Sequence, residues 1–190
     1  MRKFDFTKKL PTHNSDKYEK EYFLIFSILV AGKKASIAME KTWRLLEFTW
    51  GDETPFDYIY FLIKKERLML QLHQVKIGQY DRINRALRDI IKLDVNTCTL
   101  DDLLACHGVG SKTARFFLTH TRKDAEYAVL DTHILKWLKG VIGSSVPKST
   151  PSEKKYLQLE KKCIDLLKLH FPKLSLAEAD FEIWKRFAKV

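Results

Sequence analysis

Two residues of this 190-residue chain have side chains that together could do covalent chemistry: Lys112 and, 19 residues further on, Asp131. Lys112 stands near the start of an apolar helical pattern, where desolvation and the helix dipole favour the neutral amine over the ammonium form. A neutral amine can attack an electrophilic carbon such as the sugar C1′ of a nucleotide. A nearby carboxylate can stabilise the positive charge that grows as the base leaves, and it can help to deprotonate the amine. The resulting Schiff base permits β-elimination of the 3′ phosphate, so the pair predicts base removal followed by strand cleavage.

A helical hairpin in the stretch HGVGSKTARFFL would deliver Lys112 to such a substrate. We expect a short helix capped by Thr99, the turn Gly-Val-Gly, and a second helix from about Ser111 to His120. The glycines permit positive φ and a close approach of the backbone, and the start of the second helix suits a phosphate oxygen. The residues expected to contact the DNA backbone are Gly108, Val109, Gly110, Ser111 and Thr113.

Two other interpretations of the hairpin stay open. A Gly-x-Gly between helices is also compatible with turn chemistry alone, and its carbonyls could hold a monovalent cation. A Walker A loop is excluded, because only GSKT is present and no strand precedes it.

Asp131, in the segment AVLDTHILKWL, is also well placed to be a helix N-cap. The helix after Ser111 and the following loop would let the chain double back, so that Asp131 approaches Lys112. An N-cap aspartate can still turn one oxygen toward a pocket, so the capping and the chemical roles are compatible.

Nearly every other segment has helical spacing, which predicts an all-α protein. A first helix is expected over 15–31, with Ser15 or Asp16 as its N-cap. A second is expected over 37–48, one from Pro55 with a strand as the alternative, and two on either side of Gly78. Capping boxes are predicted at Thr150-Pro151-Ser152-Glu153, with Pro151 at the first helical position, and at Ser175–Glu178.

The composition favours a polyanionic partner. Lys and Arg number 34 against 24 Asp and Glu, a net charge of +10, and the pI is about 9.4. The longest apolar run, 22–32, has 11 residues, whereas a membrane span needs about 20. With no secretory signal, and with three cysteines in no metal-binding or CxxC spacing, we expect a cytoplasmic protein without a disulfide framework.

The hairpin and the aspartate segment together resemble those of the helix-hairpin-helix superfamily of DNA glycosylases. The resemblance begins at about Glu21 and extends over nearly the whole chain. VPKSTPSEKKYLQLE and LSLAEADFEIW look most like the short archaeal-type 8-oxoguanine DNA glycosylases. The resemblance implies one glycosylase domain over 1–190 with two helical lobes and an active-site cleft between them. Lobe A would span about 30–130, including the hairpin at 100–120, and lobe B the N-terminal segment plus 131–190.

The resemblance implies roles for individual residues of this sequence, according to their positions in the shared motifs. Lys112 resembles the Schiff-base nucleophile, Asp131 the catalytic aspartate, and His133 a residue near the phosphate of the flipped nucleotide. The carbonyls of Leu104, Cys106 and Val109 would hold a structural Na⁺ or K⁺. Trp184 and Phe116 are candidates for the base pocket, although Phe116 fits a core position equally well.

The chain also departs from the family pattern. His107 stands where the family commonly has proline, and only Cys163 lies where some members carry four cluster-binding cysteines, so we expect no iron–sulfur cluster. Lys189 is a near match to a C-terminal lysine that helps to recognise the base. The loop 31–36 corresponds roughly to the gap-filling loop, although its Lys33 and Lys34 could contact phosphate instead. Arg82, Arg85 and Arg88 suit phosphate or simply a solvated face.

The sequence therefore predicts a bifunctional DNA glycosylase/AP lyase, acting as a monomer on an oxidised purine such as 8-oxoguanine in duplex DNA. The same chemistry on oxidised pyrimidines, as in endonuclease III, is the alternative within enzymes. A non-catalytic DNA-binding hairpin module is the alternative from another class.

Overall fold

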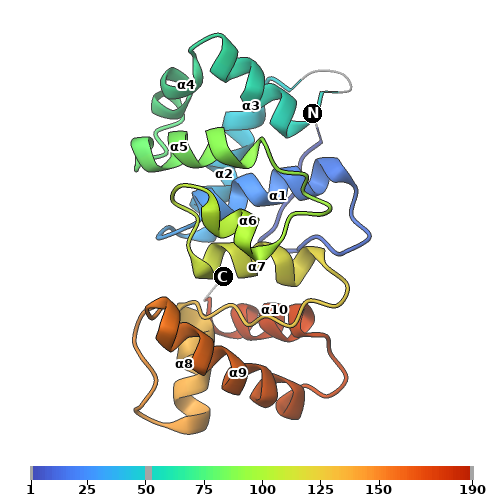
Figure 1. Cartoon of the computed structure of the whole chain (residues 1–190), viewed down its shortest axis with the longest axis vertical. Coiled ribbons are helices and arrows are strands. Elements are labelled where there is room, and N and C mark those ends of the chain that lie inside the picture. The colour runs from blue at the N-terminus through green and yellow to red at the C-terminus, as the bar shows by residue number, and fades with distance from the viewer. Residues whose placement is uncertain (1, 50–52, 189–190) are drawn as a thin grey trace. The chain divides into compact units, whose positions relative to one another are not determined.

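The computed structural model describes residues 2–49 and 53–188, and these form ten helices and no strand (Figure 1). The all-α prediction is confirmed. The chain divides into two compact units, Met1–Gly110 and Ser111–Val190, each described by itself. The first contains α1 (Lys17–Leu29), α2 (Ala35–Leu46), α3 (Pro55–Lys64), α4 (Leu68–Gln74), α5 (Tyr80–Ile90) and α6 (Leu100–Ala105). The second contains α7 (Ser111–Thr121), α8 (Thr132–Ile142), α9 (Glu153–His170) and α10 (Leu176–Phe187).

Helix α1 is the central element of the first unit. All of its residues from Lys20 to Leu29 are buried, and it packs on α2, α3 and α5. A helix that is apolar on every side is stable only when neighbours enclose it. Its one buried carboxylate, Glu21, accepts a hydrogen bond of 2.9 Å from the backbone N–H of Phe56 at the start of α3.

The N-terminal segment packs within this first unit. The ring of Phe6 lies 5.1 Å from that of Phe23 and 5.9 Å from that of Tyr22, both on α1. The indole N–H of Trp43 donates to the Phe4 carbonyl at 2.6 Å. The units thus differ in extent from the expected lobes, because these aromatic contacts keep the N-terminus with α1 and the boundary lies at Gly110.

Most predicted helix caps are present. Asp16 caps α1 and Thr99 caps α6, while α3 begins at Pro55 and α10 has the predicted capping box of Ser175 and Glu178. The capping box at Thr150 is wrong. Helix α9 begins at Glu153 with Ser152 as N-cap, and Thr150 instead donates to the Leu130 carbonyl at 3.0 Å.

The hairpin turn is closed by a hydrogen bond of 3.2 Å from the Val109 N–H to the Cys106 carbonyl, with Gly108 as the third residue of the turn. Gly108 has φ +71°, which this position of a type II turn requires, whereas Gly110 has no positive φ. The expectation of positive φ is therefore correct for Gly108 only. Arg82 donates to the carbonyls of Gly108 and Ile28, both at 3.0 Å, so it holds this turn within the first unit.

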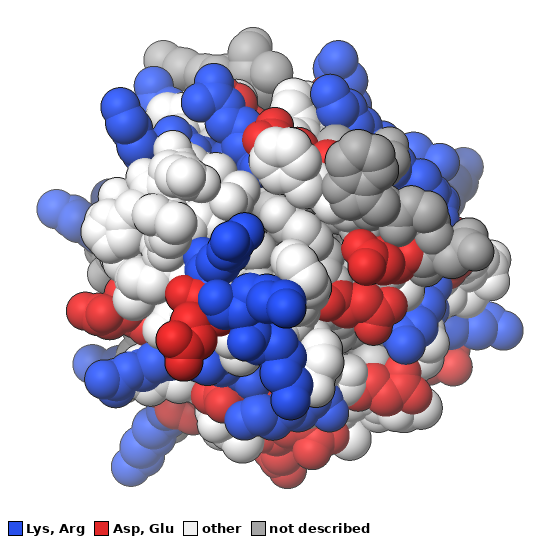
Figure 2. All heavy atoms as spheres, turned by 90° about the horizontal axis from the view of Figure 1, so that it is seen from above, with Lys and Arg blue, Asp and Glu red and all other residues white. Residues whose placement is uncertain are grey.

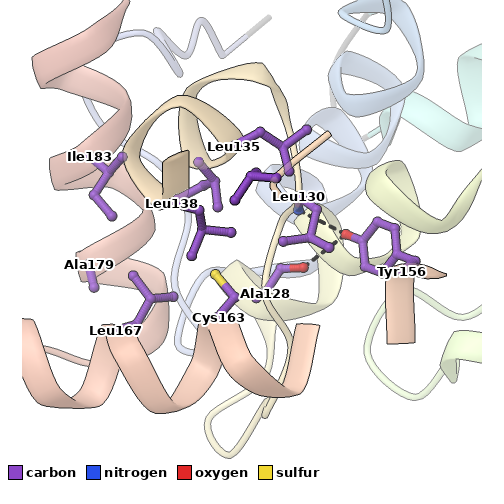
Figure 3. Packing of buried hydrophobic residues seen from close by; sticks show 11 residues of the cluster. Ala128, Leu130, Leu135, Leu138, Tyr156, Cys163, Leu167, Ala179 and Ile183 are labelled. Atoms are coloured by element: carbon purple, nitrogen blue, oxygen red, sulfur yellow. Dashed lines mark hydrogen bonds between the residues drawn. The ribbon is translucent and has the colours of Figure 1, made fainter. Parts of the chain in front are cut away.

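Helices α8, α9 and α10 enclose the core of the second unit, into which Leu135, Leu138, Cys163, Leu167 and Ile183 point (Figure 3). The segment 128–130, which belongs to no helix, runs along this core. The Tyr156 hydroxyl donates to the Ala128 carbonyl at 2.8 Å and accepts from the Leu130 N–H at 2.9 Å, as the dashed lines in Figure 3 mark. Side chains thus supply the partners that a neighbouring strand would otherwise give.

A buried arginine joins α7 to this segment. Arg115, which is 1% exposed, donates from Nε to both oxygens of Glu160 at 2.9 and 3.0 Å and from Nη2 to Glu153 at 3.1 Å. Glu160 also accepts from the Ala128 N–H at 3.0 Å. Burial raises the pKa of Glu160, although the Ala128 N–H and the Arg115 guanidinium both favour its charged form. One carboxylate therefore binds both α7 and the segment before Asp131.

Gly108→Ala should lower the free energy of unfolding by about 1–2 kcal/mol, the cost of a left-handed backbone for a residue with a Cβ. The new Cβ would also lie 2.6 Å from Cγ of Arg82. Gly110→Ala is the matched control, since a Cβ there meets nothing within 4 Å, and it should be neutral or slightly stabilising. Urea unfolding of both variants measures the two changes in the free energy of unfolding. Equal losses of stability would contradict the requirement for a left-handed backbone at Gly108 alone.

Arg115→Met should lower the free energy of unfolding by about 3–5 kcal/mol, because Glu160 would remain buried without its cation. Adding Glu160→Gln should recover part of that loss, since the amide is uncharged and still accepts from Ala128. Glu153 is 48% exposed, so the control Glu153→Gln should cost about 1 kcal/mol or less. Urea unfolding at neutral pH gives the free energy of unfolding of the wild type and of these three variants. A double variant less stable than Arg115→Met would refute this account of the pair.

Candidate active site

Lys112 lies in the first turn of α7, and its side chain is half-buried. Its Nζ lies 4.9 Å from the ring centroid of Phe116, four residues on. The edge of the Phe116 ring in turn meets His120, with centroids 5.2 Å apart and planes at 78°. Residues spaced by four share one face of a helix, so α7 presents the amine at one end of a row of rings.

Asp131 is the N-cap of α8, as predicted. Its Oδ1 accepts from the backbone N–H groups of His133 at 2.8 Å and Ile134 at 2.9 Å. Both bonds use the same oxygen, which leaves Oδ2 for another partner. The capping and chemical roles are therefore compatible here, and the bonds of Tyr156 and Glu160 to residues 128–130 fix where α8 begins.

Lys112 and Asp131 both act on a third charged group, Asp180 of α10. Asp180 is 7% exposed, and its Oδ2 lies 3.2 Å from Nε2 of His120. Burial raises the pKa of Asp180, and the bond to His120 opposes this effect. The charge of Asp131 raises the same pKa further, whereas that of Lys112 lowers it. The pKa of this buried carboxylate thus depends on both predicted residues, in opposite directions.

An aromatic group lies beside this cluster. His133, half-buried, meets Trp184 edge-on with centroids 6.3 Å apart, and Trp184 stacks on Phe181 at 5.8 Å with planes at 9°. The Nδ1 atom of His133 is buried and has no hydrogen-bond partner among the described residues. Such an atom is available to a ligand. The structure thus brings His133 and Trp184 together and puts Phe116 beside Lys112, whereas Lys189 lies outside the described residues.

The residues expected to contact DNA through the hairpin differ in exposure. Gly108 and Gly110 are exposed and Val109 is buried. The Ser111 hydroxyl donates to Glu153, and Thr113 is 5% exposed, so contacts from these two would have to use backbone N–H groups.

The two lysines of the loop before α2 also differ. Lys34 is exposed, whereas Lys33 donates to the Leu29 carbonyl at 3.2 Å. Burial lowers the pKa of Lys33, with a smaller contribution from Arg82. Lys34 is therefore the freer of the two for a phosphate contact.

No group of three or more His, Cys, Asp or Glu side chains within 2–49 and 53–188 is arranged to hold a metal ion. Cys98, Cys106 and Cys163 are buried, and none of the three takes part in a disulfide. The expected cation would use carbonyls instead. That of Cys106 accepts from Val109 but keeps a second lone pair, so the turn is chemically compatible with a monovalent ion.

The positive charge is not gathered into one patch on the face seen in Figure 2, where Lys and Arg lie interspersed with Asp, Glu and uncharged residues. Within the described part of the chain, no helix combines the length and the apolar character needed to cross a bilayer.

Sequence patterns did not identify Arg115, Glu160, Tyr156, His120 or Asp180. His120 was recognisable in principle, because it lies eight residues after Lys112 on the same helical face. Asp180 and Glu160 gave no such signal, because their partners lie 60 and 45 residues away in the chain.

Comparisons with known proteins agree with the geometry. A solved structure of the Methanocaldococcus jannaschii 8-oxoguanine glycosylase/lyase, in complex with a 15mer DNA containing 8-oxoguanine, has a TM-score of 0.69 and 23% identity to this chain. The match covers 98% of this chain and 86% of the chain in that structure. A second structure, the 8-oxoguanine DNA glycosylase of the same organism, has a TM-score of 0.65 and 22% identity to this chain. That match covers 99% of this chain and 85% of the chain in the second structure. These likenesses establish the fold.

No curated protein sequence matches the chain. A model of the Ogg-HhH family, 8-oxoguanine DNA glycosylase, matches residues 2–169, which is most of the chain. This protein therefore belongs to the 8-oxoguanine DNA glycosylase family.

Proposed function

We propose that this protein is a bifunctional DNA glycosylase/AP lyase that removes an oxidised purine such as 8-oxoguanine from duplex DNA. Lys112 is the nucleophile and Asp131 the carboxylate that assists it. The observation that carries the proposal is that one compact unit holds both residues: Lys112, half-buried in the first turn of α7, and Asp131, whose Oδ2 is not used in capping α8.

The proposed reaction begins at the Lys112 amine. Its nitrogen lone pair forms a bond to C1′ of the damaged nucleotide, the glycosidic C–N bond breaks, and the electron pair leaves with the base, which takes up a proton. Loss of the amine proton and opening of the sugar ring give a Schiff base at C1′. Removal of a C2′ proton then expels the 3′ phosphate by β-elimination, which cuts the strand.

Asp131 is suited to the assisting role. Its Oδ1 is fixed by two backbone N–H groups, so Oδ2 has a defined direction while the side chain caps α8. A fixed negative charge stabilises the positive charge that develops on the sugar as the base leaves, without further reorganisation.

The substrate class rests on family membership and on the relative that was crystallised with 8-oxoguanine DNA. A glycosylase must extrude its target base, at a cost of a few kcal/mol that is least for damaged pairs. Phe116, Trp184 and Lys189 would receive this base. His133, through its unpartnered Nδ1, and the hairpin from Gly108 to Thr113 would bind the backbone, joined by Lys33 or Lys34. The carbonyls of Leu104, Cys106 and Val109 would hold a monovalent cation, and the chain would act as a monomer.

Borohydride should trap a covalent complex between the wild-type protein and a duplex containing 8-oxoguanine, since it reduces a Schiff base to a stable amine. Lys112→Gln should abolish the adduct, because an amide cannot form the Schiff base. Lys155→Gln, on the exposed side of α9, is the matched control and should keep the wild-type yield. An adduct that persists in Lys112→Gln would assign the nucleophile to another amine.

A panel of duplexes tests the substrate. Cleavage at 8-oxoguanine should be at least ~10-fold faster than at thymine glycol or uracil, because a pocket with hydrogen-bonding groups rejects bases that leave them unpaired. Single-turnover rates of strand cleavage give the comparison.

Two results of this panel would overturn the proposal. Preference for thymine glycol would identify an enzyme for oxidised pyrimidines instead. Tight, salt-sensitive binding without any cleavage or trapping would identify a non-catalytic DNA-binding module.

A further inference from the structure

A carboxylate lies at the start of α7, where the proposed function puts the DNA backbone. Glu153, the first residue of α9, accepts a hydrogen bond from the hydroxyl of Ser111, the first residue of α7. The Glu153 side chain is 48% exposed, so its charge is open to solvent and to a ligand. The first N–H groups of a helix have no partner within it and suit an anion. A carboxylate bonded to the first residue therefore competes with a phosphate for this end of α7.

The buried arginine beside it does not require this second carboxylate. Nε of Arg115 donates to both oxygens of Glu160, whose side chain is 9% exposed, whereas Nη2 donates to the more exposed Glu153 at 3.1 Å. Two carboxylates thus share one guanidinium, and the three side chains together keep one negative charge. A half-exposed ion pair contributes little to folding. Stability alone therefore gives no reason for an acid at this position.

The same contact also turns a donor away from the DNA. A serine hydroxyl has one proton to donate, and Ser111 donates its proton to Glu153. A phosphate that approached the start of α7 would meet a negative side chain, with the hydroxyl beside it already in use. Charge and hydrogen bonding at this point both act against the backbone contact that the hairpin would otherwise make.

We propose that Glu153 weakens the binding of the hairpin to the DNA backbone, by repelling the phosphate at the start of α7 and by holding the Ser111 hydroxyl. The proposal rests on the proposed function only in placing DNA at the hairpin. Backbone contacts carry no sequence information, so Glu153 lowers the affinity for damaged and undamaged duplexes alike. Such differences in affinity lie mostly in the rate of dissociation. Glu153 thus shortens the time that the protein spends on undamaged or already cleaved DNA.

The first test is the affinity of the full chain for an undamaged duplex. Glu153→Gln keeps the shape of the side chain and can still accept from Ser111, but it removes the charge. The Kd should fall roughly threefold or more at low salt, and the gain should shrink as salt is added, because the repulsion is electrostatic and screened. An unchanged or weaker affinity would overturn the proposal.

Glu126→Gln is the matched control, since it removes the same charge from an exposed carboxylate of the same unit. Glu126 pairs with Lys168, which follows Glu153 by 15 residues along α9, a distance of about 22 Å. That exceeds the screening length of about 10 Å at 0.1 M salt, so the Kd of this control should change by less than about twofold. An equal gain in both variants would reduce the effect to net charge and contradict a specific role for Glu153.

Charge reversal separates repulsion from a structural role of the same contact. Glu153→Lys can accept neither from Ser111 nor from Arg115, so a carboxylate that only held α7 in place would leave this variant with weaker binding than the wild type. Repulsion predicts the opposite order, with Glu153→Lys binding more tightly than Glu153→Gln and dissociating more slowly in a competitor chase. Glu126→Lys is its control. Weaker binding by Glu153→Lys would refute the repulsion.

These measurements need no cleavage, so this proposal and the proposed function fail separately. Tighter binding by Glu153→Gln would support the role of Glu153 even if borohydride trapped no adduct. An affinity that does not respond to Glu153 would overturn that role even if Lys112 formed the adduct.

Discussion

The buried ion pair between Arg115 and Glu160 is the constraint on which the rest of the second unit depends. Arg115 follows Lys112 by three residues, and Glu160 accepts from Ala128, three residues before Asp131. The guanidinium also lies 4.5 Å from the Tyr156 ring, whose hydroxyl bonds the same segment. Since a buried charge cannot lose its partner cheaply, the two segments that carry the candidate catalytic groups keep a fixed relation.

This arrangement explains how the unit can form a site from short, separate pieces. The segment 128–130 has no neighbouring strand, so its backbone groups bond to Tyr156, Glu160 and Thr150. Every one of these partners comes from α9 or from just before it. Helix α9 therefore determines where α8 begins, and with it the direction in which Oδ2 of Asp131 is free.

The sequence predicted the features that depend on neighbours within a few residues. Helical spacing, the caps at Asp16, Thr99, Asp131 and Ser175, and the turn at Gly108 all follow from such local rules. It did not predict the pairings that join distant charges. Arg82 was expected on a solvated face or at a phosphate, yet it bonds the hairpin turn, because a long side chain can reach unpaired carbonyls. Thr150 was expected as a helix cap, but its hydroxyl donates to the Leu130 carbonyl instead. A threonine hydroxyl can bond to any backbone group that the fold brings near, and local sequence does not determine which one.

Asp131 and Asp180 differ in one physical respect, the exposure of their carboxylates. Asp131 is half-buried and bonded through one oxygen to backbone N–H groups, so its second oxygen can face a substrate. Asp180 is buried and hydrogen-bonded to His120, and burial raises its pKa. A group in that setting responds to nearby charge instead of meeting the substrate. If both carboxylates faced the substrate, their mutual repulsion would favour protonation of one of them and weaken the stabilisation of the sugar cation. Burial of Asp180 against His120 therefore leaves Asp131 as the carboxylate of the two that can face the reacting sugar.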